Sequence, residues 1–217
     1  MSSIKLTADS GGGTVELKAP ATTTGNAAII FKLPLVDGTS GQALTTNSSG
    51  QLAFSTIAAG ITMAETWRLT TTITNNGSEN VITSNLAKQA TPSSYGKVGT
   101  ETMTESSGVF TFPSTGIYYI TANSMHYALG ASTVGAGNGL YINTTVDNSN
   151  YSRSAFSAQA VSSNVDYGSG SSHYIMDVTD VSTHKVRFSH SGTSGSKVAG
   201  NANDNQTHFL FMKLGDT

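Results

Sequence analysis

The sequence predicts an all-β protein, and three observations lead to this prediction. Asp, Glu, Lys and Arg make up only 11% of the 217 residues, against about 25% in an average domain. About 60 residues are Ser or Thr; hydroxyl-rich surfaces suit strands and turns, whereas exposed helix faces favour Glu, Lys, Arg and Gln. Apolar and polar residues alternate over several short runs that glycine-containing turns separate, as expected for strands.

Residues 1–60 form the first of two predicted regions. They are rich in Gly, Ser, Thr and Ala, and their short apolar pieces are bounded by Gly or Pro. Residues 41–54 predict a β-hairpin, because two strand-like runs flank a turn that ends at Gly50. Since an isolated hairpin is marginal in water, we expect this region to gain its order from neighbouring copies of the chain or from a partner structure. A flexible tail is the alternative.

Residues 61–217 form the second predicted region, where the alternation is regular. Over residues 67–73, the side chains of Trp67, Leu69 and Ile73 share one face of a predicted strand, and polar side chains occupy the other face. The apolar residues 58–64 are expected to form a short helix or a linker. Further strands are predicted at residues 109–112, 117–122, 140–143, 174–178, 185–188 and 208–212.

Turn sequences between these strands support the same architecture. Positive φ values are expected at glycine in five of them, which are Asn76-Gly77, Ser107-Gly108, Ser114-Thr115-Gly116, Asn138-Gly139 and Ser191-Gly192. Seven or more short strands with such turns are typical of a β-sandwich or jelly roll.

Charge and cysteine content make several partners unexpected. The net charge is −2 and the pI is near 6.2, so no basic surface is expected to bind nucleic acid. The chain has no cysteine, and therefore no disulfide or thiolate metal site. We expect neither membrane insertion nor Sec-type secretion, because no stretch approaches about 18 apolar residues and the N-terminus has no apolar core segment.

From the sequence we expect that the protein is not an enzyme and that it has no catalytic residues, no cofactor and no metal site. No Gly-x-Ser-x-Gly turn is present, and the histidines do not show metal-ligand spacing. The glycine-rich residues 135–139 precede a predicted strand rather than a helix, so they are interpreted as a loop. Calcium is the one ion considered, since residues 147–150 and 201–205 are oxygen-rich, although neither segment matches an EF-hand loop.

Tyrosines are the candidate binding residues. Saccharide sites commonly use ring faces for sugar C–H surfaces and polar ring edges for hydroxyl groups. We take Tyr141, Tyr151 and Tyr167 as candidate receptor contacts. Packing of tyrosines in a core or at a subunit interface is the alternative.

The stretch of residues 107–122, Ser-Gly-Val-Phe-Thr-Phe-Pro-Ser-Thr-Gly-Ile-Tyr-Tyr-Ile-Thr-Ala, resembles the signature of the C1q/TNF-like jelly roll. Residues 139–143, 174–178 and 207–212 resemble three further strands of that family in the same order, although Leu210 stands where the family has a small residue. The resemblance covers residues 61–217. It implies a threefold homotrimer that binds ligands through outward loops.

The first sixty residues resemble the attachment segment of bacteriophage tail fibres. The resemblance rests on residues 4–7, 13–20, 33–34 and 41–46. It implies a virion protein, assembled in the cytoplasm of a bacterial host, whose residues 1–60 bind other phage structural proteins of the tail or capsid.

Together these resemblances imply a trimeric tail fibre whose jelly-roll head binds a host-surface glycan or protein receptor. Loops around residues 130–139, 147–154 and 164–172 are expected to carry recognition. A capsid decoration protein or head fibre with the same fold is the alternative. A glycan-cleaving tailspike would require paired carboxylates and a long β-helix repeat that the sequence lacks, and a bacterial C1q-like surface protein is a further alternative.

Overall fold

The protein was analysed as a computed structural model that describes residues 3–7, 14–18, 23, 28, 30–47, 49, 51–56, 60–88, 96–128, 136–161 and 167–217. These residues form antiparallel strands and contain no helix, so the all-β prediction is confirmed. Accordingly, the described part of the chain has no helix long and apolar enough to cross a membrane. The chain divides into two compact units, Met1–Ala58 and Ala59–Thr217.

The first unit consists of two separate strand pairs. Strand β1 (Ser3–Thr7) pairs with β2 (Thr14–Lys18), and β3 (Gln42–Thr46) pairs with β4 (Leu52–Thr56), as the sequence predicted for residues 41–54. Asn47 closes the second hairpin, because its side-chain oxygen accepts hydrogen bonds from the backbone N–H groups of Ser49 and Gln51. None of the side chains described in this unit is buried, so burial within the unit contributes little to its stability.

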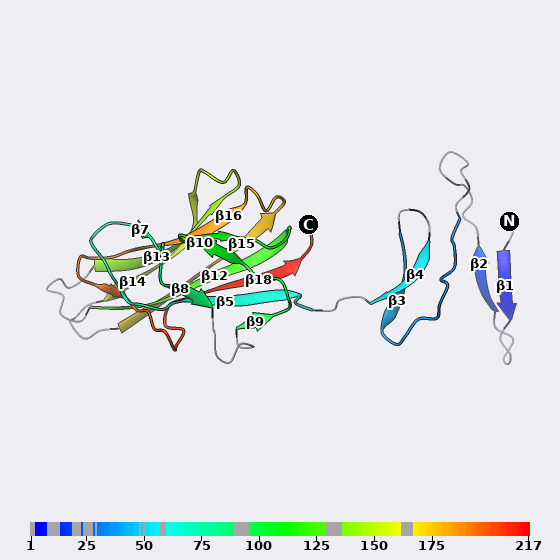
Figure 1. Cartoon of the computed structure of the whole chain (residues 1–217), viewed down its shortest axis with the longest axis horizontal. Helices are drawn as coiled ribbons and strands as arrows, with labels where there is room; N and C mark the ends of the chain where they lie inside the picture. Colours follow the sequence, from blue (N-terminus) through cyan, green and yellow to red (C-terminus); the bar gives the residue numbers. More distant parts are fainter. Residues whose placement is uncertain are drawn as a thin grey trace. The chain divides into compact units, whose positions relative to one another are not determined.

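The second unit is a sandwich of two antiparallel sheets (Figure 1). In the six-stranded sheet the order is β10-β11-β16-β13-β14, and β7 pairs with β16; in the eight-stranded sheet it is β6-β17-β12-β18-β5-β8, with β15 beside β12 and β9 beside β5. The strands of the first sheet are β7 (Asn80–Val81), β10 (Thr104–Ser106), β11 (Val109–Thr111), β13 (Ala136–Thr145), β14 (Ser152–Val161) and β16 (Lys185–Ser191). Those of the second are β5 (Met63–Leu69), β6 (Ile73–Thr74), β8 (Leu86–Lys88), β9 (Lys97–Val98), β12 (Gly116–Tyr127), β15 (Tyr167–Val178), β17 (Lys197–Val198) and β18 (His208–Gly215).

Aromatic side chains from both sheets fill the core between them. Along β12 buried and half-buried positions alternate strictly, so one face of the strand points into the core. Phe188 of β16 stacks on Phe209 of β18 with ring centroids 3.9 Å apart, and Phe110 of β11 meets Trp67 and Phe211 at 5.2 and 5.1 Å. These contacts cross between the sheets, so the opposite face of each sheet points away from the core.

All six further strands predicted between residues 109 and 212 are present, but three local predictions were wrong. Asn138 and Gly139 lie inside β13 rather than in a turn or loop: the Asn138 side chain is buried and bonded to Ser196. In the turn after β16, the positive φ belongs to Gly195 rather than to Gly192.

The third correction concerns the start of the second unit. The predicted strand at residues 67–73 begins earlier, at Met63, and ends at Leu69. The N–H of Thr70 still donates to the carbonyl of Asn85, and Ile73 belongs to a separate short strand, β6, which pairs with β17. Met63 therefore belongs to a strand, not to a helix or linker; residues 57–59 of the same apolar segment lie outside the described residues.

Candidate functional site

The outward face of the six-stranded sheet carries an exposed aromatic pair. Backbone register places Tyr141 of β13 between Ser189 of β16 and Phe156 of β14. Phe156 is 60% exposed, whereas Leu140 and Ile142, the neighbours of Tyr141 in β13, are fully buried. Because successive side chains of a strand point to opposite faces, Tyr141 and Phe156 face away from the core. Their ring centroids lie 6.1 Å apart.

Tyr141 lies flat along the sheet. Its hydroxyl oxygen is 2.6 Å from Oγ of Ser191, and a Cβ atom at Gly139 would lie only 2.6 Å from the same hydroxyl oxygen. The absence of a side chain at position 139 thus makes room for the ring. The guanidinium of Arg153 covers the ring at 4.0 Å from its centroid, which holds the arginine in a defined orientation.

Glu79 links these side chains into one network. Its carboxylate accepts a 2.5 Å hydrogen bond from Ser189 and forms an ion pair with Arg153. Ser189 in turn accepts a 2.7 Å hydrogen bond from Asn143. Partial burial opposes ionisation of Glu79, but hydrogen bonds from Ser189 and Arg153 and the nearby positive charges lower its pKa below the usual value. Since the ion pair is exposed, it contributes little to stability; its main effect is to orient Arg153.

A second arginine–tyrosine pair lies on the same sheet. The guanidinium carbon of Arg187 sits 3.9 Å from the ring centroid of Tyr151. Partial burial raises the pKa of the Tyr151 hydroxyl, and the charge of Arg187 opposes this shift. Asn143 lies opposite Arg187 in one neighbouring strand and opposite Arg153 in the other. We call the set Glu79, Tyr141, Tyr151, Arg153, Phe156 and Arg187 the outer-sheet patch.

Of the three tyrosines expected to contact a receptor, the structure brings only two to this sheet. Tyr141 and Tyr151 belong to the outer-sheet patch. Tyr167 begins β15 of the other sheet, where its ring lies 5.6 Å from that of Tyr127. The predicted recognition loops are also partly strands, because residues 136–139, 152–154 and 167–172 lie in β13, β14 and β15. Residues 129–135 and 162–166 lie outside the described residues.

The sequence did not point to Phe156, Arg153, Glu79 or Arg187. Three of them lie on strands of the patch, and β14 itself was not predicted. The inward positions of β14 include the small residues Ala155 and Ser157, so the apolar alternation that reveals a strand is weak. A β-bulge next to Asn143 also shifts the register against β14, which places Arg153 on the same face as Phe156 despite their odd spacing.

The outward face of the eight-stranded sheet is apolar at one end. Tyr119 of β12 lies between Ile175 of β15 and Met212 of β18. Ile175 is 58% exposed and Leu214, at the end of β18, is 52% exposed. We call these four residues the association face. Exposed aliphatic side chains gathered in this way on adjacent strands are typical of an interface.

The same sheet face is polar farther along β12. A cavity of about 440 Å³ opens there, and its lining includes Asn123, Ser169, Ser171, Asn205 and His208. Burial lowers the pKa of His208, and a hydrogen bond between its ring and the carbonyl of Asn205 opposes this shift. The eight-stranded sheet therefore offers an apolar and a polar surface in succession.

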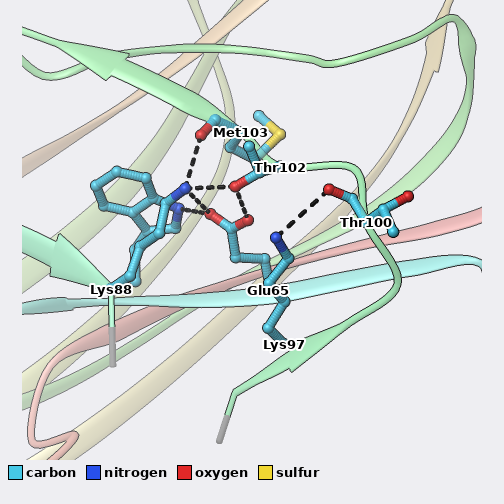
Figure 2. A network of polar contacts seen from close by, with 7 residues as sticks. Glu65, Lys88, Lys97, Thr100, Thr102 and Met103 are labelled. Carbon is cyan, nitrogen blue, oxygen red and sulfur yellow. Dashed lines mark hydrogen bonds and ion pairs between the residues drawn. The ribbon is translucent and has the colours of Figure 1, made fainter. Parts of the chain in front are cut away.

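A buried carboxylate lies at the edge of the core and has a structural role (Figure 2). Glu65 accepts hydrogen bonds from the indole of Trp67 at 2.5 Å and from the hydroxyl of Thr102, and Lys88 lies 3.1 Å from the carboxylate. Lys88 also donates to the carbonyl of Met103 at 3.2 Å. These contacts tie β5, β8 and the segment before β10 together.

Polar side chains occupy the other end of the core, where two histidines project from opposing sheets. His126 of β12 and His190 of β16 are both buried. His190 bonds to Asn75 at 2.7 Å, and Asn75 donates to Ser196 at 2.9 Å. Neither ring nitrogen of His126 makes a hydrogen bond of good geometry. Burial, reinforced by repulsion from His190 and opposed by the Lys197 backbone, lowers the pKa of His126 to about 4.

In the two segments considered for calcium, side-chain oxygens accept hydrogen bonds from within the same turn. Asp147 accepts hydrogen bonds from Thr145, from the backbone of Ser149 and from both the backbone and the side chain of Asn150. These donors, with Asn150 the strongest, hold the pKa of Asp147 well below its usual value. Asn201 similarly accepts from the backbone of Asn203. Within the described ranges, no three acidic or histidine side chains are grouped as metal ligands.

Comparison with known proteins identifies the fold. No family model matches the chain, and no curated protein matches it. Murine APRIL, solved at pH 5.0, matches 70% of this chain and 98% of its own with 10% identity and a TM-score of 0.50. The match to Eiger TNF from S. frugiperda covers 73% of this chain and 96% of that chain, with 14% identity and a TM-score of 0.50. The match to the PRD1 vertex protein P5 covers 72% of this chain and 100% of that chain, with 17% identity and a TM-score of 0.43. The sandwich is a TNF-like jelly roll, as the motif at residues 107–122 implied.

Proposed function

We propose that this protein is a structural protein of a bacteriophage particle and that its jelly-roll head binds a host-surface glycan through the outer-sheet patch. The observation that carries the proposal is the fixed arrangement of Tyr141, Arg153 and Phe156 on a sheet face turned away from the core. Exposed rings accept the C–H surface of a sugar, and the surrounding arginine, serine and carboxylate groups accept its hydroxyls. This role is binding rather than catalysis.

The head acts as a homotrimer in this proposal, and the association face forms the contact between copies. Ile175 and Leu214 would otherwise leave apolar surface in water. Closed threefold assembly covers such a face in every copy. Because the outer-sheet patch lies on the opposite sheet, it stays accessible in the trimer. Several weak sites on one particle then act together by avidity.

The first unit serves as the attachment segment. Its apolar side chains are exposed: Leu33 is 76%, Leu35 98% and Val36 75% accessible. With its sequence resemblance to phage attachment segments, this exposure supports a role in which residues 1–60 become covered by other structural proteins of the particle, of the tail or the capsid.

Binding of the fluorescently labelled full-length protein to a panel of bacterial strains tests the proposed receptor role. The change Phe156→Asp places a charge in the middle of the patch, and we expect binding to fall at least about tenfold, as for removal of a central aromatic contact. The matched control Val146→Asp alters a 66% exposed residue outside the patch and is expected to bind normally. Equal binding by the wild-type and Phe156→Asp proteins would contradict the proposed site.

A further inference from the structure

The charge at Arg187 indicates which class of glycan the patch accepts. The chain has three arginines. Arg68 donates to the carbonyl of Asn203 at 3.0 Å, and Arg153 is paired with Glu79. Arg187 forms no hydrogen bond or ion pair with any residue of the described ranges, and its Nε is buried without a partner. Arg187 as a whole is only half-buried, and its two terminal Nη groups are not among the buried atoms, so an incoming acceptor can reach these unpaired, charged donors.

The guanidinium of Arg187 is also held in place before any ligand arrives. The ring of Tyr151 supports it at 3.9 Å, which limits the rotamers that must be frozen on binding. The carboxylate of Glu79 acts on it from a distance, but that carboxylate is already bonded to Arg153 and Ser189. Arg187 is thus oriented by Tyr151 and has no carboxylate of its own among the described residues.

The spacing on the sheet fits two adjacent parts of one saccharide. Asn143 separates Arg187 from Arg153 across neighbouring strands, so the two arginine backbones lie two strand spacings apart, about 10 Å. A sugar ring on Tyr141 and Phe156 can therefore carry, on itself or on the next unit, an acidic group that reaches Arg187. Arginine binds both planar carboxylates and tetrahedral oxyanions through parallel N–H donors, which are strong and directional contacts.

We propose that the Tyr151–Arg187 pair binds the anionic group of an acidic polysaccharide, such as the carboxylate of a uronic acid or an ester sulfate. This inference rests on the proposed function, because it names the ligand class of the same patch. If the pair binds such a group, the affinity depends on charge and weakens as the salt concentration rises.

Binding of the full-length protein to immobilised polysaccharides tests this inference, with polygalacturonate as carboxylate polymer, dextran sulfate as sulfate polymer and dextran as neutral polymer. We expect binding to at least one acidic polymer, none to dextran, and weaker binding between about 0.05 M and about 0.5 M NaCl. Arg187→Gln is expected to lose about tenfold or more in affinity. Arg187→Lys retains the charge without the planar fork and should lie between the two.

The control Lys197→Gln removes a positive charge from β17 of the other sheet, where the Lys197 ammonium group donates to Thr74. This variant should bind as the wild type does. Unchanged melting temperatures of the variants exclude loss of folding as the cause. Equal affinity of Arg187→Gln and wild type, equal binding to dextran, or no binding to either acidic polymer would overturn the acidic ligand class. If Phe156→Asp still abolished binding to bacterial cells, the proposed function would stand without the acidic ligand class.

Discussion

At the scale of single residues, the two buried histidines give the sandwich a dependence on pH. His126 lies in the core opposite His190, and among the described residues the Lys197 backbone also acts on it. A histidine whose folded pKa is lowered stays neutral while the unfolded chain takes up a proton. The free energy of unfolding therefore falls as the pH drops below the unfolded pKa and levels off below the folded one.

For His126 this window runs from 6.5 to about 4. We expect the loss across it to be on the order of 3 kcal/mol, and His190, whose pKa burial also lowers, adds in the same direction. Urea unfolding between pH 7 and pH 4 measures the slope, and His126→Gln should reduce it whatever its effect on stability at pH 7. An unchanged slope would refute this assignment. Asp147 does not interfere, because the stability that its ionised carboxylate contributes is lost only as the pH falls below 3.8, the ordinary pKa of an aspartate.

At the scale of elements, the Ser107-Gly108 turn shows how a local sequence fixes a hairpin. Both residues have positive φ, 51° and 83°, and together they join β10 to β11. Gly108 also lies against the backbone of Ile82, and an added Cβ would overlap the carbonyl oxygen of that residue. The turn therefore needs glycine both for its backbone conformation and for the space around it.

Comparing Gly108→Ala with Gly77→Ala separates these two requirements. Gly77 has a similar φ of 93° but open space at its Cβ position. We expect Gly77→Ala to lower the free energy of unfolding by about 1 kcal/mol, because of its φ alone. Gly108→Ala should lower it by about 3 kcal/mol or more, because the neighbouring backbone must move. Urea denaturation of the two variants measures both costs. Equal costs would show that the contact with Ile82 is unimportant.

The elements that the sequence predicted well have large apolar residues at every second position. Residues 117–122 and 208–212 belong to this class, and both lie in core strands. Strand β14 could not be predicted in this way, because Ala155 and Ser157 bury little apolar surface. Asn138 and Gly139 resembled a turn, yet Asn138 bonds to Ser196, a partner distant in sequence, and Gly139 makes room for the ring of Tyr141 in the same strand. Tyr141 and Tyr151 of the outer-sheet patch were candidates from the sequence, whereas its other four members were missed, because strand register and a bulge bring them together.

At the scale of the whole molecule, the proposed function assigns assembly to one sheet and binding to the other. The proposed trimer corresponds to a mass of about 67 kDa for three copies of a 22.4 kDa chain. Ile175→Asp places a charge on the association face, and we expect a folded protein of about one third of that mass. Phe156→Asp, a similar change on the opposite sheet, should remain trimeric. Analytical ultracentrifugation of the full chain, with circular dichroism to verify folding, distinguishes these outcomes; a monomeric wild type would contradict the assembly.

Alternation of side chains along each strand has a consequence for how such a protein can change over time. Along β14 and β16, outward-facing positions alternate with positions that face the core. Substitutions at exposed positions usually change stability by less than about 0.5 kcal/mol. If the outer-sheet patch binds the host as proposed, exchange of the exposed Phe156 or Arg153 can therefore change specificity, while the packed interior and the opposite sheet are inherited unchanged.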